Sequence, residues 1–155
     1  MCGRVTSLHV HPAKSGEPLL TVDELHLVAD KGIREDKRYF GRKSRSTGKP
    51  SRRQVTLIER EQIAEHAAAL GLEAIGPGIV RSNIETTGMD LVSLVGREVA
   101  VGEVVVRFYE PRTPCAKMDA ICQGLRQLME NSRQGVLAEV VKSGVVRVGD
   151  KIRPL

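Results

Sequence analysis

Short runs rich in valine, leucine and isoleucine recur along the chain, separated by turns rich in glycine, proline and charged residues. Runs of this length, bounded in this way, are typical of β-strands in an antiparallel barrel or sandwich. Strands this short and numerous favour a closed or nearly closed sheet, so the pattern predicts a mainly β fold. The eight predicted strands cover residues 4–10, 20–27, 54–57, 83–86, 98–101, 104–109, 136–142 and 145–148.

Apolar positions at helical spacing are fewer. Residues 59–70 are good helix formers with an apolar stripe, and Gly71 follows as a stop signal. A second helix is predicted over residues 122–131, and a short helical turn over residues 90–95. The helices are expected to be smaller than the sheet that they cover.

The C-terminal segment, residues 144–155, predicts a final hairpin that turns at Gly149-Asp150 and closes the barrel. The chain has 155 residues, which fit one domain of ordinary size with a core of its own. Neither an internal repeat nor a linker interrupts the pattern. We therefore expect a single domain over residues 1–155.

The core must be aliphatic, because the chain has two Phe, two Tyr and no Trp. The three cysteines, Cys2, Cys115 and Cys122, are odd in number and lack CxxC spacing, which argues against a disulfide framework and a structural zinc site. We find neither a signal peptide nor a run of about 18 apolar residues. These features predict a soluble protein in a reducing, cytoplasmic setting.

Basic residues outnumber acidic ones, and the formal net charge is +5. A basic surface attracts nucleic acid, but aromatic residues make up only 3% of the chain and we find no nucleic-acid-binding motif. The densest basic segment, residues 31–53, also contains Gly, Ser, Thr and Pro. It is either a solvated loop or a flap that carries cations toward an anionic small molecule, and the sequence alone favours neither.

Cys115 is the candidate for chemistry. It lies in the segment EPRTPCAKMD, where two prolines restrict the backbone. The neighbouring cations Arg112 and Lys117 favour the thiolate, which is the form that attacks electrophiles and binds soft metals. A buried, inert cysteine is the alternative, but the polar, turn-rich neighbours argue against it.

Two further segments carry candidate binding residues. Lys14 and Ser15 lie on a predicted turn, where an ammonium group and a hydroxyl can hold a phosphate. Arg81 and Asn83 stand two positions apart at the start of a predicted strand, so they are expected to point to the same face. Arginine offers a bidentate fork for anions, and asparagine offers a donor and an acceptor for the edge of a heterocycle.

The order of these features resembles the MOSC domain family, named for the C-terminal domain of molybdenum cofactor sulfurases. The matching segments are HPAKS, Gly32 to Arg38, RRQVTLIERE, RSNIETTG, PRTPC and GVLAEVVKSGVVRVGD. The resemblance implies a β-barrel of antiparallel and mixed strands with two or three short helices. It also implies binding of the molybdenum-pterin cofactor, with Cys115 as the metal ligand or as a sulfur carrier.

The mitochondrial amidoxime-reducing proteins of this family share the Pro-x-Lys-Ser, Arg-x-Asn and cysteine patterns. The resemblance therefore places phosphate or pterin contacts on Lys14, Ser15, Arg81 and Asn83. Through the other matching segments it adds further cofactor-binding candidates: Asp36, Lys37, Arg38, Arg53, Arg112, Thr113 and Lys117.

One position departs from the family pattern. Family members commonly read Gly-x-x-Gly-Asp followed by a basic residue, whereas this chain has Glu35 in place of the second glycine. A glycine there would permit a positive φ or a close backbone approach to a ligand. The local turn is therefore expected to differ, and either Lys37 or Arg38 takes the basic role.

The resemblance leaves two activities open. In the first, the protein is an oxidoreductase that reduces N-hydroxylated compounds with electrons from a separate flavin or iron-sulfur protein. In the second, Cys115 accepts persulfide sulfur from a pyridoxal-phosphate-dependent cysteine desulfurase and passes it on. A basic, non-enzymatic module that binds nucleic acid or an acidic partner through residues 31–53 is the third hypothesis. A Cys-His hydrolase is a fourth, but the sequence places no histidine beside Cys115.

Overall fold

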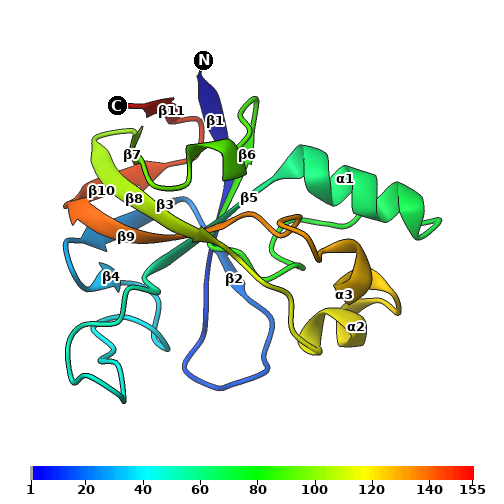
Figure 1. Ribbon diagram of the computed structural model, residues 1–155, viewed down its shortest axis with the longest axis horizontal. Coiled ribbons are helices and arrows are strands. Elements are labelled where there is room, and N and C mark those ends of the chain that lie inside the picture. The colour runs from blue at the N-terminus through cyan, green and yellow to red at the C-terminus, as the bar shows by residue number, and fades with distance from the viewer. Residues whose placement is uncertain (1) are drawn as a thin grey trace.

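The computed structural model describes residues 2–155 and is mainly β (Figure 1). Its helical elements are α1 (Arg60–Ala69), α2 (Lys117–Ile121), α3 (Leu125–Leu128) and a 3₁₀ turn, η1 (Val92–Leu94). None of the helices in residues 2–155 has the length and apolar character needed to span a bilayer. The strands are β1 (Gly3–Val10), β2 (Leu20–Val22), β3 (Glu24–Val28), β4 (Gly32–Ile33), β5 (Val55–Glu59), β6 (Ile84–Thr87), β7 (Glu98–Val101), β8 (Val104–Pro111), β9 (Val136–Lys142), β10 (Gly144–Arg147) and β11 (Lys151–Pro154).

Seven strands close into a barrel in the order β1-β11-β7-β8-β9-β5-β6, and β6 returns to β1. Strands β5 and β6 pair in parallel, because α1 carries the chain back to the starting end of β5, whereas the other neighbours are antiparallel. Strand β2 pairs with β1 at the edge of this sheet, and β10, β3 and β4 form a separate three-stranded sheet. The predicted mainly β barrel of mixed strands with short helices is confirmed.

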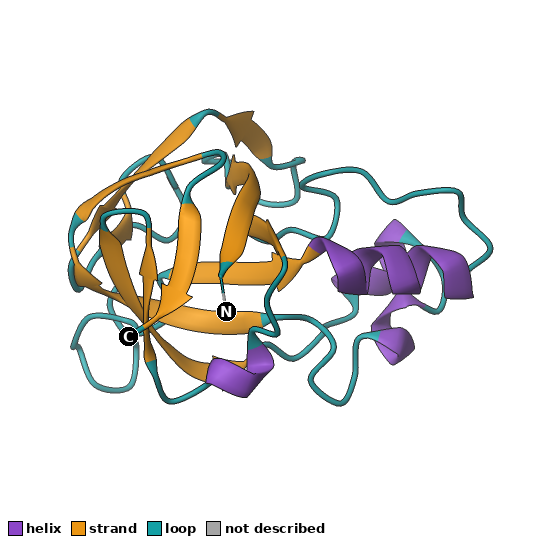
Figure 2. Ribbon diagram, turned by 90° about the horizontal axis from the view of Figure 1, so that it is seen from above, coloured by secondary structure: helices purple, strands orange, loops and turns teal. Residues whose placement is uncertain are grey.

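Two hydrophobic clusters support this arrangement. The larger one is aliphatic apart from Phe108 and fills the barrel, where Val106, Phe108, Ala138 and Val140 are buried at alternate positions of β8 and β9. The smaller one packs α1, α2 and α3 against Ile58 at one end of the barrel, where Figure 2 shows the helices gathered. The segment that carries Cys115 connects β8 to α2 and so lies between the barrel and the helices.

Three predicted elements are wrong in detail. The single strand over residues 20–27 is two strands that separate at Asp23, since β2 pairs with β1 whereas β3 pairs with β10 and β4. The helix predicted over residues 122–131 is shortened to α3, because Cys122 is extended and Gly124 lies at φ 91°, and a separate helix, α2, precedes Cys122. The carboxylate of Asp119 accepts hydrogen bonds from the Gly124 and Arg126 N–H groups in this break.

The predicted final hairpin is the third error. A turn does form at Gly149-Asp150, but β10 pairs with β3, and β11 pairs with β7 and β1. The reason is that β1 takes the turn's backbone groups: Gly149 N–H donates to the Val5 carbonyl, and Val5 N–H donates to the Asp150 carbonyl. The chain therefore leaves one sheet and enters the other at this turn, and β11 alone closes the barrel.

Candidate functional site

Asp36 is the centre of a buried hydrogen-bond network. It is 2% exposed, and its carboxylate accepts hydrogen bonds from His11 Nδ1 at 2.8 Å and from Asn83 Nδ2 at 3.2 Å. It also accepts the backbone N–H groups of His11, Arg38 and Tyr39. Burial alone would raise the pKa of Asp36, but these hydrogen bonds and His11 outweigh burial and lower it. The network fixes where the basic segment 31–53 leaves the barrel.

Asn83 joins three segments of the chain in the same interior. Its Oδ1 accepts hydrogen bonds from Thr56 N–H and Thr56 Oγ1, and its Nδ2 donates to the His9 carbonyl as well as to Asp36. The predicted shared face of Arg81 and Asn83 is wrong. Arg81 lies outside β6 at φ 65°, which breaks the strand alternation, and its guanidinium donates to the Glu17 carbonyl.

Arg112 is a buried cation at the end of β8. Its Nη1 donates to the Arg81 carbonyl and to Ser82 Oγ, both at 3.1 Å. Burial, followed by the positive charge of Arg53, lowers the pKa of Arg112 to about 10, whereas Cys115 and Tyr39 act in the opposite direction. Arg53, Arg81, Tyr39 and Cys115 are thus the charged or ionisable neighbours that act on the pKa of Arg112.

The backbone beside Arg112 needs a glycine. Arg112 N–H donates to the Gly135 carbonyl, and Gly135 lies at φ 71°. A Cβ added there would come 1.9 Å from the Leu57 carbonyl oxygen. Only glycine therefore lets β9 begin at this point and hold the end of β8 in place.

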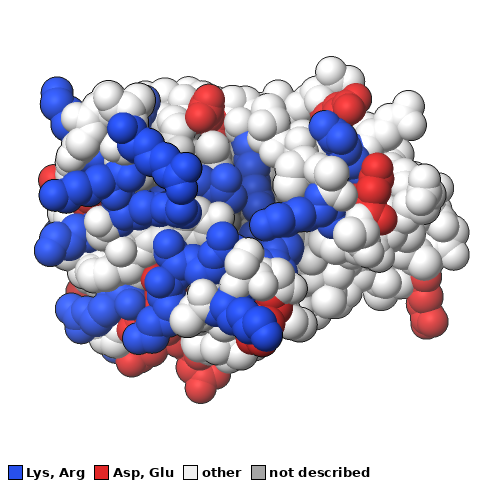
Figure 3. All heavy atoms as spheres, turned by 90° about the horizontal axis from the view of Figure 1, so that it is seen from below, with Lys and Arg blue, Asp and Glu red and all other residues white. Residues whose placement is uncertain are grey.

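Arginines surround Tyr39, which sequence reasoning did not select. The guanidinium carbons of Arg38, Arg42 and Arg53 lie 5.5, 5.5 and 5.1 Å from the centroid of its ring, within the range of cation–π contacts. The sequence did contain a signal for Tyr39: it lies among basic residues, and the chain has only two tyrosines. Figure 3 shows lysine and arginine side chains gathered on the face that carries the loops.

Several of these cations have no acidic partner. Among the ion pairs formed within residues 2–155, none includes Arg38, Arg53, Arg81 or Arg112. Positive charges gathered without acidic partners repel one another, and an anion bound among them relieves that repulsion. The arrangement is therefore suited to an anionic ligand.

Cys115 is exposed at the edge of this group, immediately before α2. Thr113 and Lys117, on either side of it, are exposed as well, as is Lys37. Cys122 is half-buried against the helix cluster. Of the predicted candidates, Arg53, Arg81 and Cys115 act on the pKa of Arg112, and the Arg81 carbonyl accepts a hydrogen bond from it.

Lys14 and Ser15 occupy an exposed turn in the loop that follows β1. Lys14 is paired with Glu17 at 3.9 Å, and the Lys14 side chain is 81% exposed. The loop is tied to the cationic group through Arg81, which binds the Glu17 carbonyl. The expected phosphate contacts of Lys14 and Ser15 stay a prediction.

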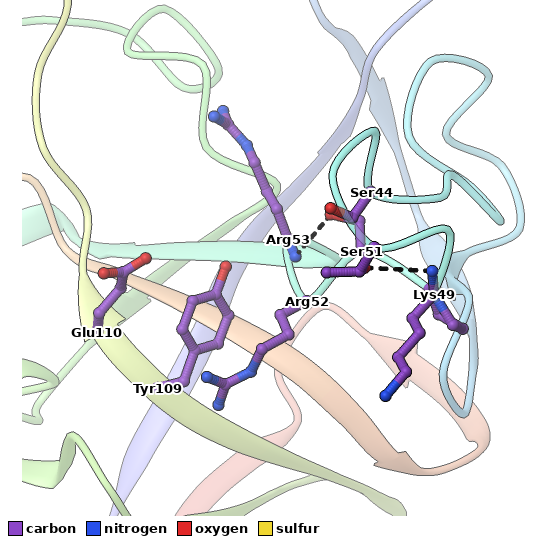
Figure 4. A pocket seen from close by; sticks show the side chains of 9 residues that line it. Ser44, Lys49, Ser51, Arg52, Arg53, Tyr109 and Glu110 are labelled. Carbon is purple, nitrogen blue, oxygen red and sulfur yellow. Dashed lines mark hydrogen bonds between the residues drawn. The ribbon is translucent and has the colours of Figure 1, made fainter.

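A polar groove of about 540 Å³ is lined by residues of the basic segment, among them Arg52 and Arg53, and by Tyr109 and Glu110 (Figure 4). Arg52 lies over the Tyr109 ring at 4.3 Å and pairs with Glu139, whereas Arg53 points away from them. Burial and the neighbouring Glu110 raise the pKa of Tyr109 to about 12. These consecutive arginines thus have different surroundings. Arg52 contacts the Tyr109 ring and the Glu139 carboxylate, whereas Arg53 lies over the Tyr39 ring.

The model of the MOSC domain matches residues 22–153 of the chain. The chain belongs to the MOSC domain family. No curated protein sequence matches this MOSC domain. The family prediction made from the sequence motifs is confirmed.

Solved structures of bacterial proteins with low sequence identity share this fold. The YUAD protein from Bacillus subtilis has a TM-score of 0.82 and 20% identity, over 98% of this chain and 94% of that one. YiiM from Escherichia coli has a TM-score of 0.68 and 21% identity, over 98% and 69%. YiiM from Geobacillus stearothermophilus has a TM-score of 0.72 and 17% identity, over 99% and 75%.

Glu35, which stands where the family has a glycine, has a structural role in this MOSC domain. Its carboxylate accepts hydrogen bonds from His26 N–H at 2.8 Å and His26 Nδ1 at 2.5 Å, and its own φ is not positive. Burial would raise the pKa of Glu35, but the hydrogen bonds from His26 outweigh burial, and the pKa is lowered. The departure from the family pattern therefore ties the basic segment to β3.

The Glu35→Gly variant is expected to be less stable by about 1–2 kcal/mol, because the two groups of His26 lose a charged acceptor. Urea denaturation at neutral pH measures this difference. Glu73→Gly, in the exposed loop after α1, is the control and is expected to change the unfolding free energy less. Equal stability of Glu35→Gly and the wild type would contradict the role given to Glu35.

Proposed function

We propose that this MOSC domain binds the molybdenum-pterin cofactor beside Cys115 and uses it to reduce N-hydroxylated compounds. The observation that carries the proposal is Arg112: a buried guanidinium with no acidic partner in residues 2–155, electrostatically coupled to Cys115. A cation removed from water without compensation is costly. Such a group is favourable where an anionic ligand completes the site.

The residues present fit this cofactor. Its pterin carries an anionic phosphate, which matches the positive charges of Arg112 and Arg53. Its molybdenum carries a dithiolene, and a protein thiolate is a suitable additional soft ligand. The exposed sulfur of Cys115 is accessible for that role.

Each group of residues has a distinct task in the proposal. Arg112 and Arg53 would bind the phosphate, and Cys115 would bind the metal. The network of Asp36 and Asn83 would hold the loops that carry these groups. When bound, the molybdenum and its pterin would supply the redox chemistry, while the protein would supply orientation and charge.

Reduction of an N-hydroxylated compound requires an electron donor. Breaking an N–OH bond to give N–H and water consumes two electrons and two protons. The chain has no recognisable motif for a flavin or an iron-sulfur cluster. A separate flavin or iron-sulfur protein would therefore deliver the electrons.

A second candidate follows from the exposure of Cys115, since a carrier thiol must reach into a partner's active site. In this case the Cys115 thiolate attacks the outer sulfur of a persulfide on a pyridoxal-phosphate-dependent desulfurase. The donor's S–S bond breaks, its thiolate leaves, and Cys115 holds the persulfide. The exchange is balanced without an added oxidant.

Two assays on the same variants separate these candidates. The cofactor-loaded chain is expected to reduce an aryl amidoxime with a chemically reduced viologen as electron donor. Cys115→Ala is expected to lose this activity, and Cys122→Ala to keep it. If the wild type shows no reduction but accepts radiolabelled sulfur from a desulfurase on Cys115, the carrier replaces the reductase.

A further inference from the structure

A second hollow is lined by Arg81, whose backbone carbonyl accepts the hydrogen bond from Arg112. It consists of two adjoining spaces of about 350 and 290 Å³ that share Gly16, Arg81 and Ile121. Sites for small ligands are concave, mostly apolar and of this size. The hollow lies between the loop after β1, the loop before β6 and helix α2.

The walls of the hollow are apolar. They include Pro18, Leu19, Pro77 and Ile79 from the two loops, with Ile121 from α2. Ile79 is 47% exposed, although it is a large aliphatic side chain. Two of the wall residues are prolines, which restrict the backbone and favour a hollow that exists before a ligand binds.

Two cations stand at the rim. Arg81 borders both spaces, and Lys117 borders the one next to α2. Neither forms an ion pair within residues 2–155, and the nearby carboxylate of Glu17 is paired with Lys14 instead. The only side-chain hydrogen bond of Arg81 in that range goes to the Glu17 carbonyl, which leaves the positive charge of its guanidinium uncompensated.

Two residues of the rim connect the hollow to the proposed cofactor site. Lys117 is two residues beyond Cys115, and the carbonyl of Arg81 accepts the hydrogen bond from Arg112. A molecule that reaches the rim would therefore contact Arg81 and Lys117, which belong to the same segments as Arg112 and Cys115.

We infer that this hollow is the substrate pocket, and that it takes a molecule with a flat apolar body and one anionic group that binds Arg81 and Lys117. Its identity as a substrate pocket rests on the proposed function, whereas the binding preference does not. The apolar walls set the body of the ligand, and the rim cations set the sign of its charge. An acidic aryl compound fits this pocket better than its neutral counterpart.

Two fluorescent probes of nearly the same shape test the inference. They are 1-anilinonaphthalene-8-sulfonate, which is anionic, and N-phenyl-1-naphthylamine, which lacks only the sulfonate. The full chain as purified is expected to bind one equivalent of the anionic probe, about tenfold more tightly than the neutral one. Arg81→Met should reduce this preference several-fold, with Lys117 retained, and leave the neutral probe unchanged, because only the sulfonate contacts the rim cations.

The matched variants test the apolar wall. Ile79→Ser is expected to weaken both probes several-fold, whereas Val148→Ser, at a similarly exposed aliphatic residue far from the hollow, should weaken neither. Binding of several equivalents, or no response to Arg81→Met and Ile79→Ser, would overturn the inference. So would a concentration-dependent dimer that Ile79→Ser dissociates, because the hollow would then be covered by a second chain. Because the probes need no cofactor, absence of molybdenum would overturn the proposed function and leave this result intact.

Discussion

Replacing Arg112 by methionine is expected to lower the affinity for the molybdenum-pterin cofactor by at least about 100-fold, because the anion then loses its buried, charged donor. The free energy of unfolding of the cofactor-free chain should stay within about 1 kcal/mol or rise. The variant loses hydrogen bonds to the Arg81 carbonyl and Ser82 Oγ, but it no longer buries a guanidinium without an acidic partner. Pterin retained after gel filtration and urea denaturation measure the two effects.

Arg107→Met is the matched control for this variant. Arg107 lies on β8, the strand that Arg112 follows, but it is at the surface and pairs with Glu98 at 2.8 Å and Glu139 at 3.5 Å. Its single positive charge is thus already compensated by two carboxylates, and we expect Arg107→Met to retain the cofactor as the wild type does. Retention by Arg112→Met at the wild-type level would mean that Arg112 is structural and does not bind the anion.

The largest loss of stability is expected for Asp36→Ala, at about 3–5 kcal/mol. The substitution removes a buried carboxylate and leaves its donors, including His11 Nδ1, Asn83 Nδ2 and two loop N–H groups, without an acceptor. Thermal and urea denaturation measure the loss. Asp23→Ala, whose side chain is exposed, is the control and should change stability by less than about 0.5 kcal/mol.

The pH dependence of stability provides a second readout for Asp36. Its pKa in the folded protein is lowered from the ordinary value of 3.8, so the folded state holds the charged form more strongly than the unfolded state does. The stabilisation is therefore complete above about pH 4 and is lost as the pH falls through the folded pKa. Asp36→Ala should lose part of this acid sensitivity. A wild-type acid sensitivity in the variant would contradict the role of Asp36.

Much of the barrel was predictable because its strands depend on local pattern. Buried positions alternate along β8, and the apolar stripe of α1 ends at a glycine, so both were found from sequence. The final hairpin was not predictable. Its turn residues are as expected, but β1, more than 140 residues away, binds their backbone groups, and no local signal reports that contact.

The candidate site was predictable as a set of residue types, but its arrangement was not. The resemblance selected Arg53, Arg81, Arg112 and Cys115; Arg112 binds the Arg81 carbonyl, and the other two act on the pKa of Arg112. Sequence reasoning could not tell that Arg112 is buried while Lys14 is exposed, because burial depends on distant segments such as Gly135 and Ser82. It also missed the positive φ of Arg81, since a non-glycine residue rarely adopts that conformation.

The most direct test of the central claim is the molybdenum and pterin content per chain. The wild type, Cys115→Ala and Cys122→Ala would be purified without oxygen from a host that makes the cofactor. We predict near-stoichiometric molybdenum and pterin in the wild type and in Cys122→Ala, and loss of the metal from Cys115→Ala. Absence of both metal and pterin from the wild type would contradict the account.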